Sequence, residues 1–290
     1  MLMMVFSYAD DACICYVGDD WESTFTLASN DLQTIYNWYT SMTLQLNLDK
    51  SNYMTFSITS TGQPPEQLTL TIPLSDNQTT TLQKLTSTRY LGIILDQHLK
   101  WSPHIQTLQT KLRHLMHIFS NLRRVCSKNI LRMVYHALVQ SLLQYCICSW
   151  GGAYTNAINP LKRGQNIILR IILHKDRLFH TKTLYSLLDV FPLTDIYMYK
   201  MTLYSIKYDH LWPRQITTYN TRRSRQDLVQ IRRVNKSLAQ RHFYYLGLKL
   251  YNIIPQNIKM WKERPLLLKL KTQEFIKQSD LTIEKLLPMT

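Results

Sequence analysis

The segment FSYADDACICYV at residues 6–17 places two adjacent carboxylates, Asp10 and Asp11, between two runs of β-forming residues. Carboxylates held about 4 Å apart repel each other strongly in a low-dielectric site, so a cation must neutralise them if both are ionised. Mg²⁺ binds one or two carboxylates plus substrate phosphates, and a pair of such ions supports in-line phosphoryl transfer. A solvated β-turn is the other interpretation, because Asp tolerates turn geometry. The local sequence leaves both readings open.

Two short apolar runs flank the acidic pair, and together they predict a buried β-hairpin with Asp10 and Asp11 at its tip. The apolar spacing that follows, from residue 23 to residue 46, is typical of an amphipathic helix. A turn and a strand are expected over residues 47–58, and Gly with paired Pro marks a loop at 59–67. Further strands are expected at residues 68–74, 79–85 and 89–96.

The pattern changes after residue 100. Ser102 and Pro103 form a good helix start, with Ser as the N-cap and Pro at the first helical position. Periodicity then predicts helices at residues 102–125, 127–150, 156–173, 182–190, 195–211, 236–252 and 264–277. A basic, poorly periodic stretch at 217–233 is expected to be a loop. The predicted fold class is therefore α+β for residues 1–100, followed by a helical and basic region.

The charge of the chain is divided unequally along its length. Residues 1–110 carry 4 basic and 10 acidic side chains, a net −6, whereas residues 111–290 carry 30 and 9, a net +21. This asymmetry indicates an acidic working region joined to a basic clamp, and nucleic acid is the favoured polyanion. A basic, solvated face is the alternative.

Several aromatic residues are interleaved with cations in the basic region. They are Tyr197, Tyr199, Tyr204, Tyr208 and Trp212. Aromatic rings between cations suit stacking on single-stranded nucleic acid. The same residues recur near helical spacing, and this favours packing in a helical core.

Cysteine usage argues against a disulfide framework or a zinc site. The five cysteines are Cys13, Cys15, Cys126, Cys146 and Cys148, and none belongs to a CxxC pair. They are predicted to be buried, reduced thiols of an intracellular protein. His114 and His117 lie about one helical turn apart, but no further ligand stands at a suitable spacing, so we expect them on a helix surface.

Targeting signals give an expectation of compartment. The first residues, MLMMVF, lack the basic region of a signal peptide, and no apolar run approaches 18 residues. We therefore expect a nuclear or cytoplasmic protein that is not secreted and has no membrane partner.

YADD (8–11), LQLNLDKSNYMTF (44–56) and RYLGIILDQHLKWSPHI (89–105) resemble, in this order, successive palm elements of non-LTR (LINE-type, jockey-like) retrotransposon reverse transcriptases. Softer similarity follows in YCICSWGG (145–152), GQNIILRII (164–172), TRRSR (221–225) and GLKLYNIIPQNI (247–258). The resemblance implies the second half of a polymerase palm, built of antiparallel β-hairpins plus a helix. A mostly helical, basic thumb and C-terminal region would follow it.

The resemblance also implies an activity and a metal site. The activity is RNA-directed DNA polymerisation by Mg²⁺-dependent nucleotidyl transfer, with Mn²⁺ as an alternative ion. Asp10 would ligate the metal ions, and Asp11 would be its partner. Lys50 stands where the family places a lysine that protonates the leaving pyrophosphate or orients the triphosphate; a lysine can pair with phosphate as a point charge.

Other positions would contact the RNA template and the DNA primer. Tyr8 and Ala9 would shape the hairpin near the incoming nucleotide and the primer end. Tyr90, Leu91 and Gly92 match the strand that supports the primer, although ordinary strand packing explains Tyr90 and Leu91 equally well. The densest basic positions, expected to bind nucleic acid, are Arg123, Arg124, Arg222, Arg223 and Arg225.

The family pattern also contains an aspartate on an earlier strand, a nucleotide-binding region and fingers, none of which precedes Tyr8 here. We therefore expect a C-terminal fragment that begins just before the YADD motif and is inactive without the upstream polymerase half as its partner. A catalytically dead nucleic-acid-binding remnant and a pseudogene product with an open sheet edge are the alternatives. The expected domains are a partial palm at 1–100, a thumb-like helical region at 101–175 and a basic helical extension at 176–290.

Overall fold

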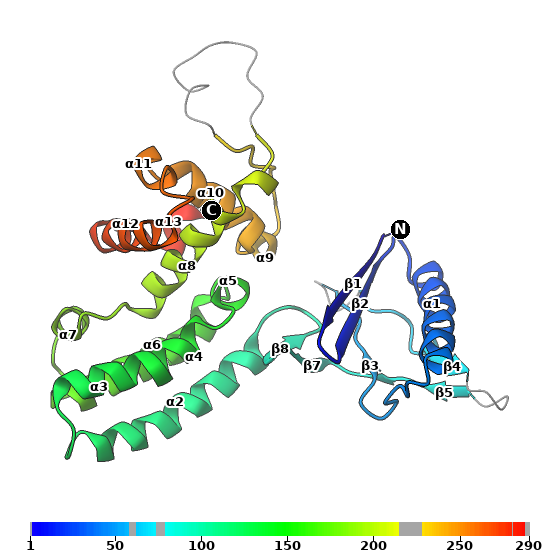
Figure 1. Cartoon of the computed structure of the whole chain (residues 1–290), viewed down its shortest axis with the longest axis horizontal. Helices are drawn as coiled ribbons and strands as arrows, with labels where there is room; N and C mark the ends of the chain where they lie inside the picture. Colours follow the sequence, from blue (N-terminus) through cyan, green and yellow to red (C-terminus); the bar gives the residue numbers. More distant parts are fainter. Residues whose placement is uncertain (1, 58–61, 74–78, 215–227, 280, 288–290) are drawn as a thin grey trace, which may run out of the picture. The chain divides into compact units, whose positions relative to one another are not determined.

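The computed structural model describes residues 2–57, 62–73, 79–214, 228–279 and 281–287. The chain forms two compact units, Met1–Pro103 and His104–Thr290 (Figure 1). The first unit mixes strands with one long helix, and the second is helical. The elements of the first unit are β1 (Leu2–Tyr8), β2 (Asp11–Val17), α1 (Trp21–Ser41), β3 (Asn52–Tyr53), β4 (Thr71–Pro73), β5 (Thr79–Thr81), β6 (Gln83–Lys84), β7 (Ser87–Tyr90) and β8 (Ile93–Asp96).

The strands of the first unit pair in twos among the described residues. β1 with β2, β4 with β5 and β7 with β8 are antiparallel, whereas β3 and β6 are parallel. The parallel pairing of β3 with β6 follows from the order of the strands along the chain. The partner of β3 arrives only after β4 and β5, and a partner that returns by such a crossover can run parallel.

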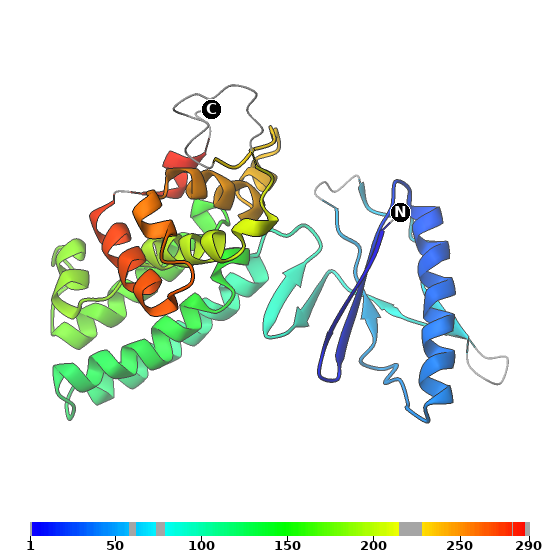
Figure 2. The same cartoon turned by 45° about the horizontal axis from the view of Figure 1, so that its top comes forward.

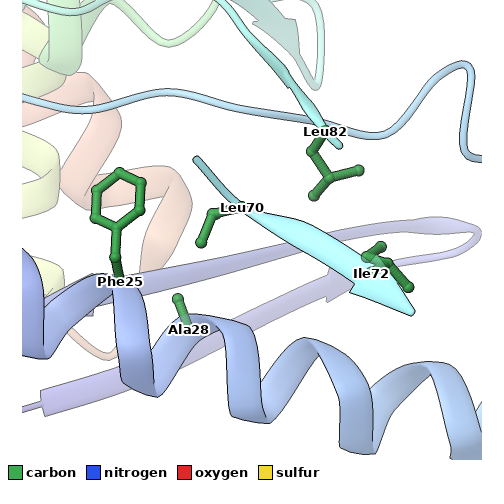
Figure 3. Packing of buried hydrophobic residues seen from close by; sticks show 5 residues of the cluster. All are labelled: Phe25, Ala28, Leu70, Ile72 and Leu82. Atoms are coloured by element: carbon green, nitrogen blue, oxygen red, sulfur yellow. The ribbon is translucent and has the colours of Figure 1, made fainter. Parts of the chain in front are cut away.

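The core of the first unit lies between α1 and the strands that follow it. Phe25 and Ala28 of α1 point toward Leu70, Ile72 and Leu82, and all five are buried (Figure 3). Phe25 and Ala28 are three residues apart, so they lie on the same face of α1, and this apolar face packs into the core. These contacts pack α1 against β4 and the residues next to it.

The ends of α1 have local causes. The Asp20 carboxylate accepts a hydrogen bond from the backbone N–H of Ser23 at 2.7 Å, which caps the first turn. The helix ends at Ser41, and Thr43 then adopts a left-handed backbone with φ of 57°. The sequence prediction of a helix to residue 46 is therefore too long, because periodicity alone does not register this left-handed turn.

The second unit consists of helices. They are α2 (Ser102–Leu122), α3 (Lys128–Val134), η2 (Tyr135–Gln140), α4 (Ser141–Gln144), α5 (Ile147–Trp150), α6 (Thr155–Leu173), α7 (Thr181–Leu188), α8 (Leu193–Lys207), η3 (Asp209–Leu211), α9 (Ser237–Gln240), α10 (Phe243–Ile253), α11 (Gln256–Lys259), α12 (Pro265–Gln278) and α13 (Ile283–Leu286). Residues 127–150 thus form several pieces where periodicity predicts one helix. The left-handed backbone of Cys146, with φ of 48°, separates α4 from α5.

A π-helical stretch explains an unusual apolar period in this region. Buried side chains recur every four residues at Leu131, Tyr135, Val139, Leu143 and Ile147. An α-helix would rotate such a stripe gradually around its axis. The wider i→i+5 turn of η2, in the middle of the run, compensates for that rotation and keeps the stripe in the core.

Gln165 joins α6 to three other elements of the second unit. Its side chain is fully buried, and its Nε2 donates to Tyr135 Oη at 2.7 Å and to the Phe191 carbonyl at 2.9 Å. Its Oε1 accepts from the Leu193 backbone N–H at 2.9 Å and from Tyr185 Oη at 3.0 Å. The helices before and after residue 175 therefore share buried contacts through Gln165.

Candidate active site

The predicted acidic tip is a two-residue hairpin loop. Tyr8 and Asp11 are the closing pair of β1 and β2, and Ala9 and Asp10 form the loop between them. Ala9 has φ of 53°, a left-handed value that two-residue hairpin turns require at their first loop position. Glycine is usual there, and alanine costs about 1 kcal/mol or more in this conformation. The strained backbone of Ala9 therefore forms the tight turn at which Asp10 and Asp11 project into solvent; both are exposed.

The hairpin strands are less buried than their sequence predicts. β1 and β2 run side by side as one long hairpin (Figure 2). Every residue of β1 is exposed, whereas most of β2, including Cys13 and Cys15, is half-buried. The reason is that β1 pairs only with β2 among the described residues, so one strand edge and much apolar surface stay uncovered. Such an edge is a template for another strand.

Val5→Lys is expected to slow self-association of the chain at least severalfold. Val5 lies in the middle of β1 with 57% of its surface exposed, and a charge there opposes strand pairing. The measurement is light scattering against time at several protein concentrations. Thr26→Lys is the matched control. Thr26 is exposed on α1, so this substitution adds the same charge away from the β1 edge. Equal slowing by both variants would show that net charge, not the β1 edge, controls association.

β7 and β8 correct the single strand predicted at residues 89–96. Tyr90 and Ile93 close a second two-residue hairpin, in which Leu91 has φ of 45° and Gly92 has φ of 80°. Two left-handed residues in succession define a type I′ turn. Gly92 therefore serves the turn, and Tyr90 is the only one of the three predicted primer-supporting residues that lies in a strand.

Asp11 of the acidic tip influences the pKa of Tyr90. Partial desolvation raises the pKa of Tyr90, and interactions with the ionisable groups of Cys13, Asp11 and Cys15 raise it further. The structure thus brings a residue of the third motif near a residue of the first. Cys13 lies beside Cys15 at 3.9 Å, and burial together with Cys15 raises the pKa of Cys13 to about 11. The Cys13 thiol therefore stays neutral at physiological pH.

Lys50 lies at the end of a turn that hydrogen bonds to Asn47 stabilise. The Asn47 carbonyl accepts from the backbone N–H groups of Lys50 and Ser51, and its side-chain Oδ1 also accepts from Lys50 at 3.2 Å. The sequence prediction of a turn followed by a strand is confirmed here, although β3 is only two residues long. The Lys50 side chain is exposed and forms no ion pair with Asp10 or Asp11 in the described part of the chain.

Asp96 is an organising residue that sequence reasoning missed. It is buried at the end of β8, where its carboxylate accepts from the backbone N–H groups of Lys100 at 3.0 Å and Trp101 at 2.7 Å. These bonds hold a turn in which Leu99 and Trp101 both have positive φ. The signal in the sequence is an Asp directly after an apolar strand, which is typical of side-chain-to-backbone turns.

The expected nucleic-acid contacts are described only in part. Arg123 is half-buried and Arg124 is exposed, in the turn after α2. Arg222, Arg223 and Arg225 lie outside the described residues. Among the interleaved aromatics, Tyr197 and Trp212 are buried, whereas Tyr204 is exposed and stacks on Tyr208 with ring centroids 5.8 Å apart. Core packing is thus confirmed for the buried pair.

The side chains at the hairpin tip can be judged as metal ligands by the chemistry of their donor atoms. Asp10 and Asp11 supply hard carboxylate oxygens, which suit Mg²⁺ or Mn²⁺ together with substrate phosphates. Among the described residues, no three or more His, Cys, Asp or Glu side chains gather as a metal cluster. His114 and His117 are exposed on α2. The tip thus offers two hard oxygen donors of the kind that Mg²⁺ and Mn²⁺ prefer.

The chain is similar to one curated protein, the probable RNA-directed DNA polymerase from transposon X-element of Drosophila melanogaster. The two are 22% identical over 174 residues, which cover 58% of this chain but only 18% of that protein. No protein-family model matches the chain, and no solved structure matches it. The similarity supports a reverse-transcriptase-like function.

Membrane insertion finds no support in the helices. In the part of the chain that the structure describes, every helix is too short or too polar to cross a bilayer.

Proposed function

We propose that this chain is part of the RNA-directed DNA polymerase of a non-LTR retrotransposon, in which the β1–β2 tip carries catalytic carboxylates. The observation that carries the proposal is the tight, strained hairpin that projects Asp10 and Asp11 from a YADD sequence. The similarity to the transposon polymerase supports it. The first unit would be the second half of the palm, and the second unit would be the thumb and a basic extension.

The residues of the tip would divide the work. Asp10 and Asp11 would hold Mg²⁺ or Mn²⁺, which supplies charge stabilisation for the attacking and leaving oxygens of nucleotidyl transfer. The left-handed backbone of Ala9 aims the tip, and Tyr8 closes it, with 68% of its surface exposed for a nucleotide or primer end. Lys50 is an exposed cation for the triphosphate.

The two carboxylates need a third ligand from another polypeptide segment. The free edge of β1 supports this step, because it offers unpaired backbone groups and apolar side chains to an added strand. A strand that pairs there would lie beside the tip and could carry the missing carboxylate. The 290-residue chain would then be inactive alone.

A second candidate function is nucleic-acid binding without catalysis. The net +21 of residues 111–290 favours it, since each phosphate that a Lys or Arg neutralises releases counterions on binding. Such binding would weaken steeply with salt and would not need Asp10 or Asp11.

Primer extension tests the proposed function. The 290-residue chain, and any longer translation product that contains it, are assayed with Mg²⁺, nucleotides and a DNA primer on an RNA template. We expect the short chain to bind without extending the primer, and the longer product to extend it. Asp10→Asn should abolish extension, because an amide cannot replace an anionic metal ligand.

The control for this assay is Asp19→Asn, which removes the same charge from an exposed residue beyond the tip. It should leave extension unchanged. Extension that survives Asp10→Asn, or fails equally in both variants, would overturn the catalytic role of the tip. Salt-sensitive binding by every product, with no extension by any, would favour the second candidate function.

A further inference from the structure

A cleft in the second unit gathers polar groups that the proposed catalysis does not use. The cleft lies between α5, α6, α8 and α13, and part of it opens to solvent. Gly151, Thr155, Lys162, Tyr197, Arg241 and Glu284 are among the residues that line it. The YCICSWGG motif ends in this cleft, so the motif has a structural role apart from the palm.

Two glycines make room for the cleft wall. A Cβ on Gly151 would lie 2.3 Å from Cδ2 of Tyr197, and a Cβ on Gly152 would lie 2.2 Å from the backbone carbonyl oxygen of Arg241. Real Cβ atoms do not approach other atoms so closely. Glycine at both positions therefore lets α8 and the segment before α10 close on the end of α5.

The Tyr197 hydroxyl is the unexplained group in this wall. Tyr197 is 2% exposed, and its hydroxyl has no hydrogen-bond partner among the described residues. Leaving a buried hydroxyl unpaired costs about 1–3 kcal/mol. Burial, and secondly Cys148, raise the pKa of Tyr197, so that the hydroxyl remains a proton donor at neutral pH. A ligand with acceptor oxygens would satisfy it.

The charges around the cleft select the sign of such a ligand. Lys162 forms no ion pair or hydrogen bond with any described side chain, and Arg241 makes only a weak bond to the Ala153 carbonyl and a contact over the Tyr154 ring. The nineteen-residue helix α6 begins at the cleft, and Tyr154 provides no side-chain cap for its first N–H groups. Uncapped N–H groups and the helix dipole favour an anion.

Glu284 is the opposing group. It lies at the start of α13 and lines the same cleft. One carboxylate against the two cations and the helix N-terminus leaves the cleft positive.

We propose that this cleft binds a phosphate group between Lys162, Arg241, the N-terminus of α6 and the Tyr197 hydroxyl. Phosphate offers acceptor oxygens in several directions, and cations, a hydroxyl and backbone N–H groups are the usual donors to it. The phosphate belongs to a free phosphate compound or to the end of a nucleic-acid strand. This site does not depend on the acidic tip.

Calorimetric titration of the full chain tests the proposal. The probes are inorganic phosphate, pyrophosphate and a dinucleotide with or without a 5′-phosphate. We expect Lys162→Gln to weaken phosphate binding roughly tenfold and Tyr197→Phe to weaken it roughly fivefold, because each removes one hydrogen bond to an anion. Tyr197→Phe should not lower the melting temperature without ligand, since it removes an unpaired buried group.

Arg163→Gln is the matched control, because Arg163 neighbours Lys162 on α6 but is exposed outside the cleft. It should change the affinity less than twofold. Equal loss in Arg163→Gln and Lys162→Gln, no effect of Tyr197→Phe, or no binding of any probe would each overturn the site. Preference for the 5′-phosphorylated dinucleotide would assign the phosphate to a strand end, and preference for the inorganic ions would assign it to a free compound.

Discussion

Gln165→Leu is expected to destabilise the second unit by about 4 kcal/mol, because it leaves several buried polar groups without partners. Leucine fills nearly the same volume but can neither donate nor accept. The groups left behind are Tyr135 Oη, the Phe191 carbonyl and the Leu193 N–H, while Tyr185 Oη keeps a bond to Asn166 at 2.6 Å. At about 1–3 kcal/mol for each orphaned group, three of them account for the estimate.

The position of Gln165 explains why the loss should be cooperative. Its amide joins η2, α7 and the start of α8 to α6, so no single neighbour can restore all the bonds by a small shift. Buried networks of this kind stabilise a structure when every member is satisfied and destabilise it when one is removed. We therefore expect a lower unfolding midpoint and not merely local fraying.

Urea unfolding followed by circular dichroism measures this effect. Gln106→Leu is the matched control, because Gln106 is exposed on α2 and its side chain makes no hydrogen bond in the described structure. The control should stay within about 0.5 kcal/mol of the natural chain. Similar midpoints for the two variants would show that the Gln165 network does not hold the helices together.

Local patterns in the sequence predict the long elements well. The hairpin at the N-terminus, α2, α6 and α12 all follow from apolar spacing and from start signals such as Ser102 with Pro103. These elements are regular over many residues, so a periodic pattern has room to appear. The tip motif is likewise contiguous, and its place between two strands could be predicted directly.

The features that sequence reasoning missed depend on single backbone turns or on distant partners. Leu91 and Gly92 lack the Asn-Gly or Asp-Gly signature of a type I′ turn, so β7 and β8 look like one strand. The exposure of β1 depends on which strand lies beside it, and the period of its own residues contains no such information. The phosphate cleft joins residues 151, 162, 197 and 241, which no local pattern connects.

Gly152→Ala is expected to destabilise the second unit by about 3 kcal/mol, the upper range for overpacking of a buried site. The added methyl would meet the Arg241 carbonyl oxygen at 2.2 Å and the Tyr197 hydroxyl at 3.1 Å. The first contact is with backbone, so a rotamer change cannot relieve it. The segment that leads into α10 must move away, and the cleft must widen.

Gly247→Ala is the control that separates this clash from a general effect of replacing glycine. Gly247 is buried in α10, and its added methyl would lie 3.3 Å from the Phe243 ring, a side chain that can move aside. Alanine favours a helix by about 1 kcal/mol over glycine, which offsets the tight contact, so we expect a change within about 1 kcal/mol. Thermal unfolding compares the two variants under one condition.

The two glycine variants also connect stability with the cleft. If Gly152→Ala moves the Arg241 segment, phosphate affinity should fall together with the melting temperature, whereas Gly247→Ala should preserve both. If the Gly152→Ala variant had the same melting temperature as the natural chain, the close approach of the end of α5 to Arg241 would be contradicted. The cleft would then lack one of its walls, because the same approach places the Arg241 backbone close to the Tyr197 hydroxyl.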